Sequence, residues 1–321
     1  MPELKYKDLP NGITCIESWY QSEGIACCYL MEADGQFALI DTGTARTAPM
    51  IMELLENKSI AKEQVRYIIP THVHLDHAGG AGQLMAQLPE AELIIHPYGS
   101  RHMIDPSKLQ AGATAVYGAE AFKKEFDTLL PIPATRVIEM DDGMQLDLNG
   151  RILQLIETPG HARHHLVVWD EVSKGLFSGD VYGNGYPEMH TTNGRYLMPV
   201  TSPVQLDPPV WHESIDKLLS FNPQRVYLTH YGMLENPQER AEQLHQDLDA
   251  YVKIALSLDA ENRYENLLEQ ISRYHMENIQ AHGCTLPTKE IDRLIGSDLV
   301  LCAQGLDIWL QRQEQSFNLK H

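Results

Sequence analysis

The sequence predicts a mixed α/β (α+β) protein that ends in a helical extension. Short β-favouring runs alternate with helical patterns over most of the 321 residues. Towards the C-terminus, apolar residues such as Leu244, Leu248 and Tyr251 recur only at helical spacing. A hydrophobic content of 43% can supply a sizeable core. We therefore expect one domain over residues 1–236 and a C-terminal helical extension over residues 237–321.

The N-terminal third predicts strands joined first by a tight turn and then by helices. Residues 12–41 predict a meander of strands, with Ala33-Asp34-Gly35 as the turn between the last two. Helical spacing over residues 46–57 comes next, and the apolar run at residues 65–70 predicts a buried strand. These segments together predict a strand–helix–strand unit. A helix at 83–88 and a strand at 92–96 complete this part.

Residues 97–133 contain no β-favouring runs of the kind seen before them. They predict a helical insertion, with one helix over residues 113–130. An insertion of this length near a site often shapes it. Strands return afterwards, and Asn149-Gly150 predicts a hairpin turn. The later strands are expected at 145–148, 152–156, 166–169, 175–177 and 224–229, with a helix at 210–221. Residues 181–209 are rich in Gly, Pro and Tyr, and predict an irregular loop.

One short stretch gathers four side chains that bind metals. It reads His72-Val73-His74-Leu75-Asp76-His77 and lies between the buried strand at 65–70 and a glycine-rich helix start. In an extended or tightly looped segment, His72 and His74 point the same way and can share one cation. Asp76 and His77 follow a turn and can reach a second cation beside it. Imidazole and carboxylate suit zinc, and also iron or manganese.

Four further short segments, here called stations, each carry one Asp or His and accompany this motif in a fixed order. They are Leu39-Ile40-Asp41-Thr42-Gly43 before it, and Thr158-Pro159-Gly160-His161, Phe177-Ser178-Gly179-Asp180 and Leu228-Thr229-His230 after it, each at the end of an apolar run. With these stations the chain resembles the metallo-β-lactamase superfamily from about residue 12 to residue 232. The resemblance implies a four-layer αββα sandwich, which the C-terminal helices would extend.

The resemblance also implies a complete set of metal ligands. His161 would join His72 and His74 around one ion, His230 would join Asp76 and His77 around the other, and Asp180 would bridge them. The expected cofactors are two divalent ions, with Zn²⁺ favoured and Fe or Mn as alternatives. Asp76 and Asp180 are the predicted catalytic carboxylates.

Other residues are expected to support the site without binding metal. The resemblance gives Asp41 an orienting role, although a turn-capping role is the alternative. His165, or its neighbour His164, could donate a hydrogen bond into the site or pack at a strand start. Candidate substrate contacts are Tyr182, Tyr186 and His190, for which a surface position in the loop is the alternative.

At several positions this chain carries other residues than well-known members of the superfamily, and these differences exclude some of the possible functions. Many of those members carry Cys at the position of Asp180 and Lys at the position of Gly183, so this chain is not expected to be a true β-lactamase. Oxygen-handling relatives carry Glu at the position of His74. We therefore expect a hydrolase of the glyoxalase II-like branch that cleaves an ester, thioester or lactone through a metal-bridging hydroxide. The alternatives are an iron-bound redox or oxygen-binding protein and a regulatory protein with a vestigial site.

Composition and charge restrict the partners. The formal net charge of −19 disfavours nucleic acid as a partner, so we expect a small-molecule substrate. The first residues lack the apolar core of a signal peptide, and no apolar run reaches membrane-spanning length, which predicts a cytoplasmic protein. Five cysteines do not form a disulfide framework pattern. The C-terminal helices could bind the carrier portion of a substrate, pack within the chain, or form a homodimer interface.

Overall fold

The computed structural model describes residues 3–201 and 205–318, which form two compact units. The first unit comprises the chain up to Glu157, together with His164–Gly179 and Pro223–Glu235. The second unit comprises Thr158–Arg163, Asp180–Asn222 and the chain from Asn236 onward. The division into one domain over residues 1–236 and an extension over residues 237–321 stays a prediction.

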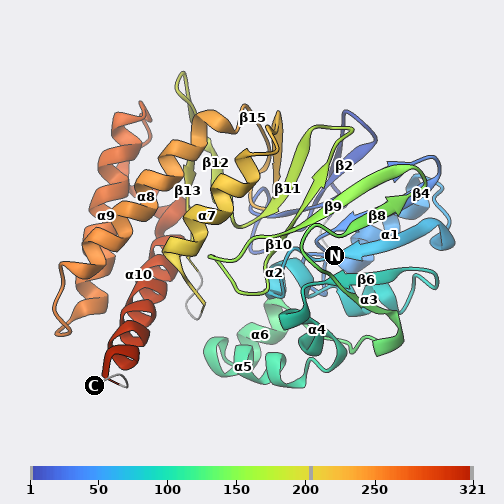
Figure 1. Cartoon of the computed structure of the whole chain (residues 1–321), viewed down its shortest axis with the longest axis horizontal. Helices are drawn as coiled ribbons and strands as arrows, with labels where there is room; N and C mark the ends of the chain where they lie inside the picture. The colour runs from blue at the N-terminus through green and yellow to red at the C-terminus, as the bar shows by residue number, and fades with distance from the viewer. Residues whose placement is uncertain (1–2, 202–204, 319–321) are drawn as a thin grey trace. The chain divides into compact units, whose positions relative to one another are not determined.

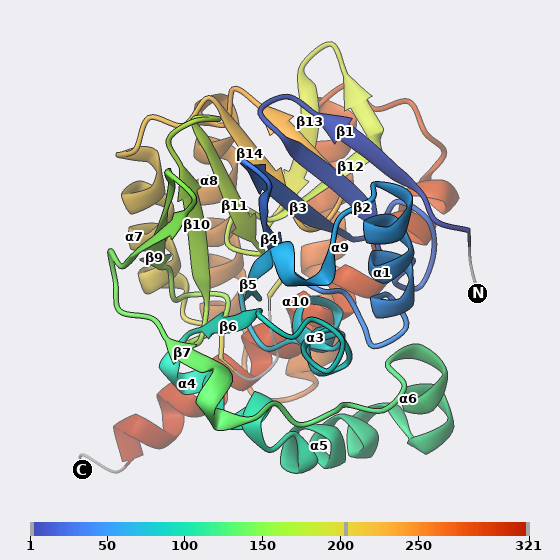
Figure 2. The ribbon, with the colours of Figure 1, turned by 90° about the vertical axis from the view of Figure 1, so that its right-hand side faces the viewer.

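The first unit contains two sheets, and the larger one has seven strands in their order along the chain. Its N-terminal strands are antiparallel neighbours, as the predicted meander requires, and its later strands pair in parallel. Figure 2 shows β2, β3 and β4 side by side in this sheet. The strands are β1 (Tyr6–Leu9), β2 (Ile13–Glu17), β3 (Cys27–Ala33), β4 (Gln36–Ile40), β5 (Val65–Ile69), β6 (Glu92–Ile95) and β7 (Val137–Glu139).

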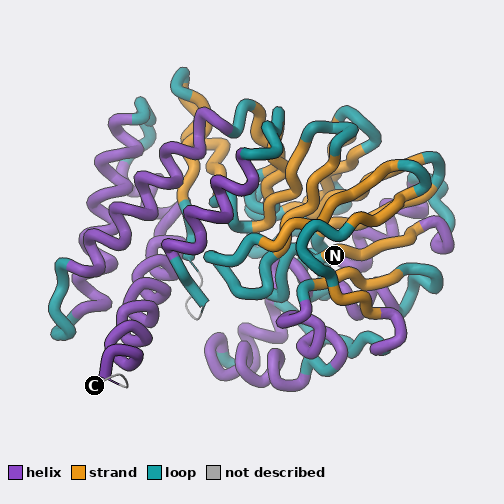
Figure 3. The backbone as a smooth tube through the Cα atoms, viewed as in Figure 1, coloured by secondary structure: helices purple, strands orange, loops and turns teal. Residues whose placement is uncertain are grey.

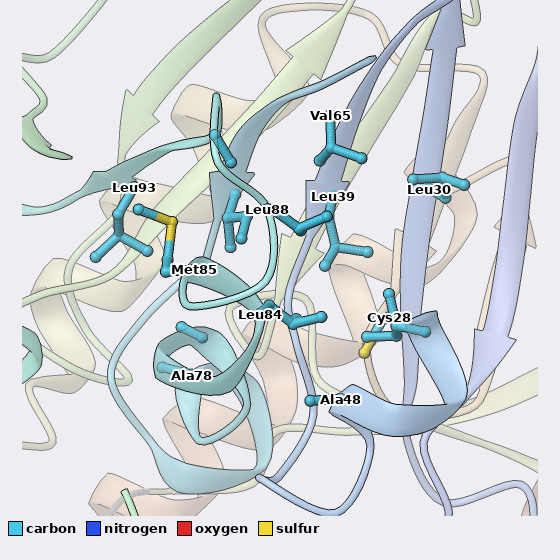
Figure 4. Close-up of a cluster of buried hydrophobic side chains, with 14 of the residues drawn as sticks. Cys28, Leu30, Leu39, Ala48, Val65, Ala78, Leu84, Met85, Leu88 and Leu93 are labelled. Atoms are coloured by element: carbon cyan, nitrogen blue, oxygen red, sulfur yellow. The ribbon is translucent and has the colours of Figure 1, made fainter. Parts of the chain in front are cut away.

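Helices make the crossovers between the parallel strands, because parallel neighbours cannot be joined by a tight turn. They are α1 (Ala48–Asn57), α2 (Leu75–Ala78), α3 (Ala81–Met85) and α4 (Pro97–Ile104), with a short 3₁₀ helix at Lys62–Gln64. Leu54 of α1 and Leu84 of α3 are fully buried in a cluster with Leu39 and Leu93 of the sheet. Figure 4 shows Leu39, Leu84 and Leu93 in this cluster. Burial of each such side chain stabilises the fold by roughly 1.5–3 kcal/mol.

The second sheet has six strands in the order β15-β14-β11-β10-β9-β8. Its inner face packs on the first sheet through a second cluster, which contains Met31 and Ile40 of one sheet and Leu155 and Val168 of the other. The strands are β8 (Gln145–Leu148), β9 (Arg151–Glu157), β10 (Leu166–Asp170), β11 (Gly175–Gly179), β14 (Arg225–Leu228) and β15 (Gly232–Glu235). The first unit therefore contains a helix layer and two packed sheets.

Tyr29 ties the two sheets together next to the last predicted metal ligand. Its ring meets Phe177 and Tyr227 of the second sheet edge to face, with centroids 5.3 and 5.5 Å apart. Its hydroxyl donates a hydrogen bond of 2.5 Å to the carbonyl of Leu228. This bond fixes the end of β14, where the chain continues through Thr229 to His230.

The predicted insertion at residues 97–133 is helical, but its main helix is broken. Two helices, α5 (Ser107–Tyr117) and α6 (Ala119–Glu125), occupy the region where the sequence predicted one helix over residues 113–130. They separate at Gly118, whose φ of +82° lies outside the right-handed helical region. Phe122 and Phe126 of this segment pack against Leu75, so the insertion contacts the metal-binding motif directly.

The second unit combines a hairpin with four longer helices. The hairpin is β12 (Asn184–Thr191) and β13 (Gly194–Met198), so our prediction of an irregular loop over residues 181–209 was wrong for these strands, while residues 202–204 lie outside the described residues. Figure 3 shows the C-terminal helices of this unit in purple, consecutive along the chain. The helices are α7 (Pro208–Leu219), α8 (Gln238–Leu256), α9 (Arg263–Ala281) and α10 (Thr288–Asn318).

The observed elements confirm the predicted mixed α/β fold with a C-terminal helical extension. Among residues 3–201 and 205–318, no helix combines the length and the apolar character needed to cross a membrane.

Candidate metal centre

The histidine-rich motif begins where β5 ends, as the sequence predicted. His72 and His77 are fully buried, and His74 is half-buried just before the first turn of α2. His72 Nε2 and His74 Nδ1 are only 2.7 Å apart. Two imidazole nitrogens that approach so closely can share a proton or bind one cation.

A second set of ligand atoms lies beside this pair in the first unit. One ligand atom each from Asp76, His77 and His230 lies within 4.8 Å of the others. Asp76 Oδ2 is 3.7 Å from His77 Nε2 and 3.5 Å from His230 Nε2. Residues 76 and 77 come from the motif, whereas His230 follows the end of β14. The structure therefore brings together the three residues that the sequence assigned to one ion.

Hydrogen bonds at the far side of the rings set the tautomers of two of these histidines. His77 Nδ1 lies 2.9 Å from Asp41 Oδ2, and His230 Nδ1 lies 3.0 Å from the carbonyl of Ile25. Because both oxygens are acceptors, each Nδ1 must carry the proton. In the neutral imidazole each Nε2 then carries the lone pair, which is the form that binds a metal.

Asp41 contacts several residues of the motif, and the orienting role implied by the family resemblance stays a prediction. It lies just after β4 with a φ of +55° and is 1% exposed. Its carboxylate accepts hydrogen bonds from the backbone and hydroxyl of Thr71, from the His77 ring, and from the hydroxyl of Thr229. It therefore joins the ends of β4, β5 and β14 on one carboxylate.

Replacement of Asp41 by asparagine is expected to lower the affinity for metal by about 10- to 100-fold, the usual effect of losing a partner of a metal-binding histidine. The amide lacks the charge and presents an N–H₂ group to one of the donors. Isothermal titration of the metal-free protein with Zn²⁺ measures the effect. Asp34→Asn is the matched control, since Asp34 also has positive φ but lies in the turn after β3, away from the motif. Equal affinities in the two variants would contradict the assigned role.

Thr71 and Thr229 are supporting residues that the sequence analysis missed. Both precede a predicted ligand, in the pairs Thr71-His72 and Thr229-His230, and both hydroxyls reach Asp41. The repeated Thr-His pair after an apolar strand was a signal in the sequence.

His164 and His165 contact residues of the motif within the first unit. The ring of His165 is fully buried, with its centroid 5.0 Å from that of His72. A Cβ on Gly179 would lie 2.6 Å from His165 Nε2 and 2.7 Å from Thr71 Oγ1, so only glycine fits there. His164 Nδ1 accepts a hydrogen bond of 3.4 Å from the backbone of Val73, between the first two histidines of the motif.

His161 and Asp180 belong to the second unit and form a pair there. His161 Nδ1 donates to the carbonyl of Val200 at 2.9 Å, and His161 Nε2 lies 3.4 Å from Asp180 Oδ2. The two residues are 2% and 7% exposed. His161 therefore repeats the arrangement of His77 and His230, with one nitrogen held by an oxygen and the other facing a carboxylate.

The three predicted substrate residues also lie in the second unit. Tyr182 and Tyr186 are fully buried, and their hydroxyls donate to the carbonyl of Pro237 and to Asp298 Oδ2. Burial raises the pKa of Tyr182, so its hydroxyl stays protonated. His190 is exposed on β12. These contacts give both tyrosines a packing role, and substrate binding by the three residues stays a prediction.

Comparisons with known proteins show the family to which the chain belongs. The family profile described as the metallo-beta-lactamase superfamily matches residues 23–230. Metallo-beta-lactamase fold-containing protein ST1585 of Sulfurisphaera tokodaii is 29% identical over 232 residues, which are 70% of this chain and 79% of that protein. Its crystal structure superposes with a TM-score of 0.59 at 24% identity and covers 85% of this chain and 99% of its own.

Two further proteins are similar. The crystal structure of TTHA1429 from Thermus thermophilus, a metallo-beta-lactamase family protein, has a TM-score of 0.63 at 20% identity and covers 96% of this chain and 95% of its own. Human acyl-coenzyme A thioesterase MBLAC2 is 29% identical over 191 residues, which are 56% of this chain and 67% of that protein. On its sequence profile and its fold, this chain belongs to the metallo-β-lactamase superfamily.

Proposed function

We propose that this chain is a dinuclear metal-dependent hydrolase that cleaves a thioester, ester or lactone. The observation that carries the proposal is the donor set of the first unit: Asp76, His77 and His230 converge, and the two imidazoles present Nε2 lone pairs. Nitrogen and carboxylate donors of this kind suit Zn²⁺ best among the common ions, with Fe and Mn as alternatives.

The proposal keeps the ligand set that the family resemblance implies. His72, His74 and His161 would hold one ion, Asp76, His77 and His230 would hold another, and Asp180 would be a ligand of both. Ions bound there would supply Lewis acidity and lower the pKa of a coordinated water to about 7, as in other zinc sites. Asp41 keeps His77 in the Nδ1–H tautomer, and the carbonyls of Val200 and Ile25 do the same for His161 and His230.

A thioester is the first substrate class to test. Several relatives are described as thioesterases, among them the human acyl-coenzyme A thioesterase MBLAC2 and an atrochrysone carboxyl ACP thioesterase of Aspergillus fumigatus. The second of these is 24% identical over 217 residues, which are 67% of this chain and 53% of that protein. β-Lactams are not the expected substrates. Many antibiotic-degrading members carry Cys and Lys where this chain has Asp180 and Gly183.

Metal removal tests the proposal directly. Untagged protein is analysed for bound elements, dialysed against a chelator and assayed with acyl-coenzyme A, aryl ester, lactone and phosphodiester substrates. We expect hydrolysis of a thioester, ester or lactone that chelation abolishes and Zn²⁺ restores. Full turnover by metal-free protein would refute the proposal.

Two other outcomes would favour the alternative functions. An iron-derived visible absorption band together with reaction with oxygen would favour the redox protein. Metal-loaded protein that turns over no substrate of the panel would favour the regulatory protein. Cytoplasmic location, a small-molecule substrate and a homodimer through the C-terminal helices stay proposals, and light scattering measures the last of them.

A further inference from the structure

Four titratable side chains form a cluster on α7 and α8, two neighbouring helices of the second unit (Figure 1). His212 and Asp216 are four residues apart on α7, and His245 and Asp249 are four residues apart on α8. At this spacing, the two side chains of each helix lie on the same face. None of the four belongs to the ligand set of the superfamily motif.

Each of the two histidine rings directs one nitrogen towards the other ring. His212 Nδ1 and His245 Nδ1 are 2.6 Å apart, and the rings are parallel within 4°. The ring centroids are 4.9 Å apart. Because the nitrogens are much closer together than the centroids, the nitrogen edges of the two rings face each other.

The other nitrogen of each ring faces a carboxylate of the opposite helix. His212 Nε2 lies 3.3 Å from Asp249 Oδ1, and His245 Nε2 lies 3.3 Å from Asp216 Oδ1. A carboxylate at Nε2 favours a proton on that atom and leaves a lone pair at Nδ1. Metal-binding histidines are commonly held in this way, with the nitrogen that does not bind metal donating to a carboxylate.

Two lone pairs 2.6 Å apart repel each other unless a positive charge lies between them. A shared proton or a metal ion can supply this charge. Imidazole nitrogens are common ligands of transition-metal ions, and two of them are already directed at one another here.

We propose that His212 and His245 form a second metal site, which binds a divalent transition-metal ion such as Zn²⁺, Ni²⁺ or Cu²⁺ through their Nδ1 atoms and so links α7 to α8. Asp216 and Asp249 are positioning residues that hold the rings. Water fills the remaining coordination positions, because the carboxylates lie at the far edges of the rings. With two protein ligands, the site should bind more weakly than the main centre that we propose.

The rings need only a small movement to accept the ion. Zn–N bonds of about 2.0–2.1 Å at a tetrahedral angle place the two nitrogens about 3.3 Å apart. The histidine side chains are 25% and 24% exposed, and the carboxylates are 79% and 72% exposed, so rotation of the side chains can open the gap. The 2.7 Å separation of His72 Nε2 and His74 Nδ1 is a similar approach, within the motif that defines the family's metal site.

Titration of the fully loaded protein separates this site from the main centre. Untagged protein, first saturated with Zn²⁺ and freed of excess, is titrated with Ni²⁺ by calorimetry and with Cu²⁺ by electron paramagnetic resonance. We expect one additional equivalent and a Cu²⁺ spectrum with coupling to two imidazole nitrogens. His212→Ala and His245→Ala should each remove this equivalent. His102→Ala is the matched control and should retain it, since His102 is also a half-buried histidine on a helix.

The carboxylates provide a graded test. Asp216→Asn and Asp249→Asn should each weaken the additional site by about 10- to 100-fold. Circular dichroism melting of every variant checks that the helices remain folded. Absence of the additional equivalent in the unmodified protein would overturn the proposal and favour a shared proton. An equivalent that persists in both histidine variants would overturn it as well.

Discussion

Replacement of Asp180 by asparagine is expected to reduce hydrolysis by more than about 100-fold and to leave the fold intact. A residue that only orients a metal-binding histidine costs about 10- to 100-fold when it is removed, and a bridging ligand should cost more. Asp180 is 7% exposed, and its carboxylate lies 3.4 Å from His161 Nε2. Asparagine keeps the shape of the side chain but removes the charge that would neutralise two cations.

The experiment combines turnover with metal content. Thioester hydrolysis, bound zinc per chain and a circular dichroism melt are measured on the same preparation of each variant. Asp292→Asn, an exposed change on α10, is the matched control and should behave as the unmodified protein. If Asp180→Asn retained full turnover and its complement of metal, Asp180 would not be a bridging ligand, and the proposed mechanism would have to be abandoned.

The parts of the fold that the sequence predicted best are those that alternate apolar runs with strong turn signals. Asn149-Gly150 lies between β8 and β9, where the hairpin was expected. The motif at residues 72–77 follows β5 directly. A buried strand that ends in polar metal ligands has few other interpretations, because unpaired polar groups are costly to bury.

The wrong prediction of an irregular loop over residues 181–209 has a physical cause, which is packing that local patterns do not encode. The hairpin of β12 and β13 contains a proline and glycines, which argued against strands. Its buried residues Asn184 and Tyr186 hydrogen-bond to Asp298, more than a hundred positions later in the chain. Asn193-Gly194, at the turn of this hairpin, was the one local signal for it.

In the candidate site too, contacts between neighbours in the chain could be predicted from the sequence, and contacts between distant segments could not. His72 to His77 are adjacent in the chain, so their convergence followed from their spacing. The binding of Thr71 and Thr229 to Asp41 joins segments that are up to 188 positions apart. No periodicity within a single segment can predict such a contact, and only the family resemblance pointed to Asp41.

Replacement of Arg151 by methionine is expected to destabilise the first unit by about 3–5 kcal/mol, the usual cost of breaking a buried ion pair by removing one partner. Arg151 is 7% exposed and its partner Asp170 is fully buried. Two guanidinium nitrogens donate to the two carboxylate oxygens at 3.0 and 2.6 Å. The third donates to the carbonyls of Asn11 and Glu32, so this side chain joins the second sheet to the first.

Arg66→Met is the matched control, because Arg66 pairs with Glu92 on the surface. The nitrogen–oxygen distance is 3.7 Å, and the side chains are 44% and 37% exposed. An exposed pair contributes at most about 1 kcal/mol, so this variant should unfold at nearly the same urea concentration as the unmodified protein. Equal shifts of the urea midpoint in the two variants would refute the importance of burial for the Arg151 pair.

The pH dependence of the same measurement tests the charge of Asp170. Burial alone would raise the pKa of this carboxyl, but hydrogen bonds from Arg151 and Ser173 outweigh it and hold the pKa below its ordinary value. A lowered pKa in the folded state contributes stability above the unfolded value of about 3.9, and this stability is lost as the pH falls further. Without Arg151, burial instead favours the protonated acid, so the destabilisation in Arg151→Met should shrink as the pH is lowered from about 7 to below about 4. A difference that stays constant over this range would mean that Arg151 stabilises the unit by packing and by its bonds to the two carbonyls, and not through the carboxylate.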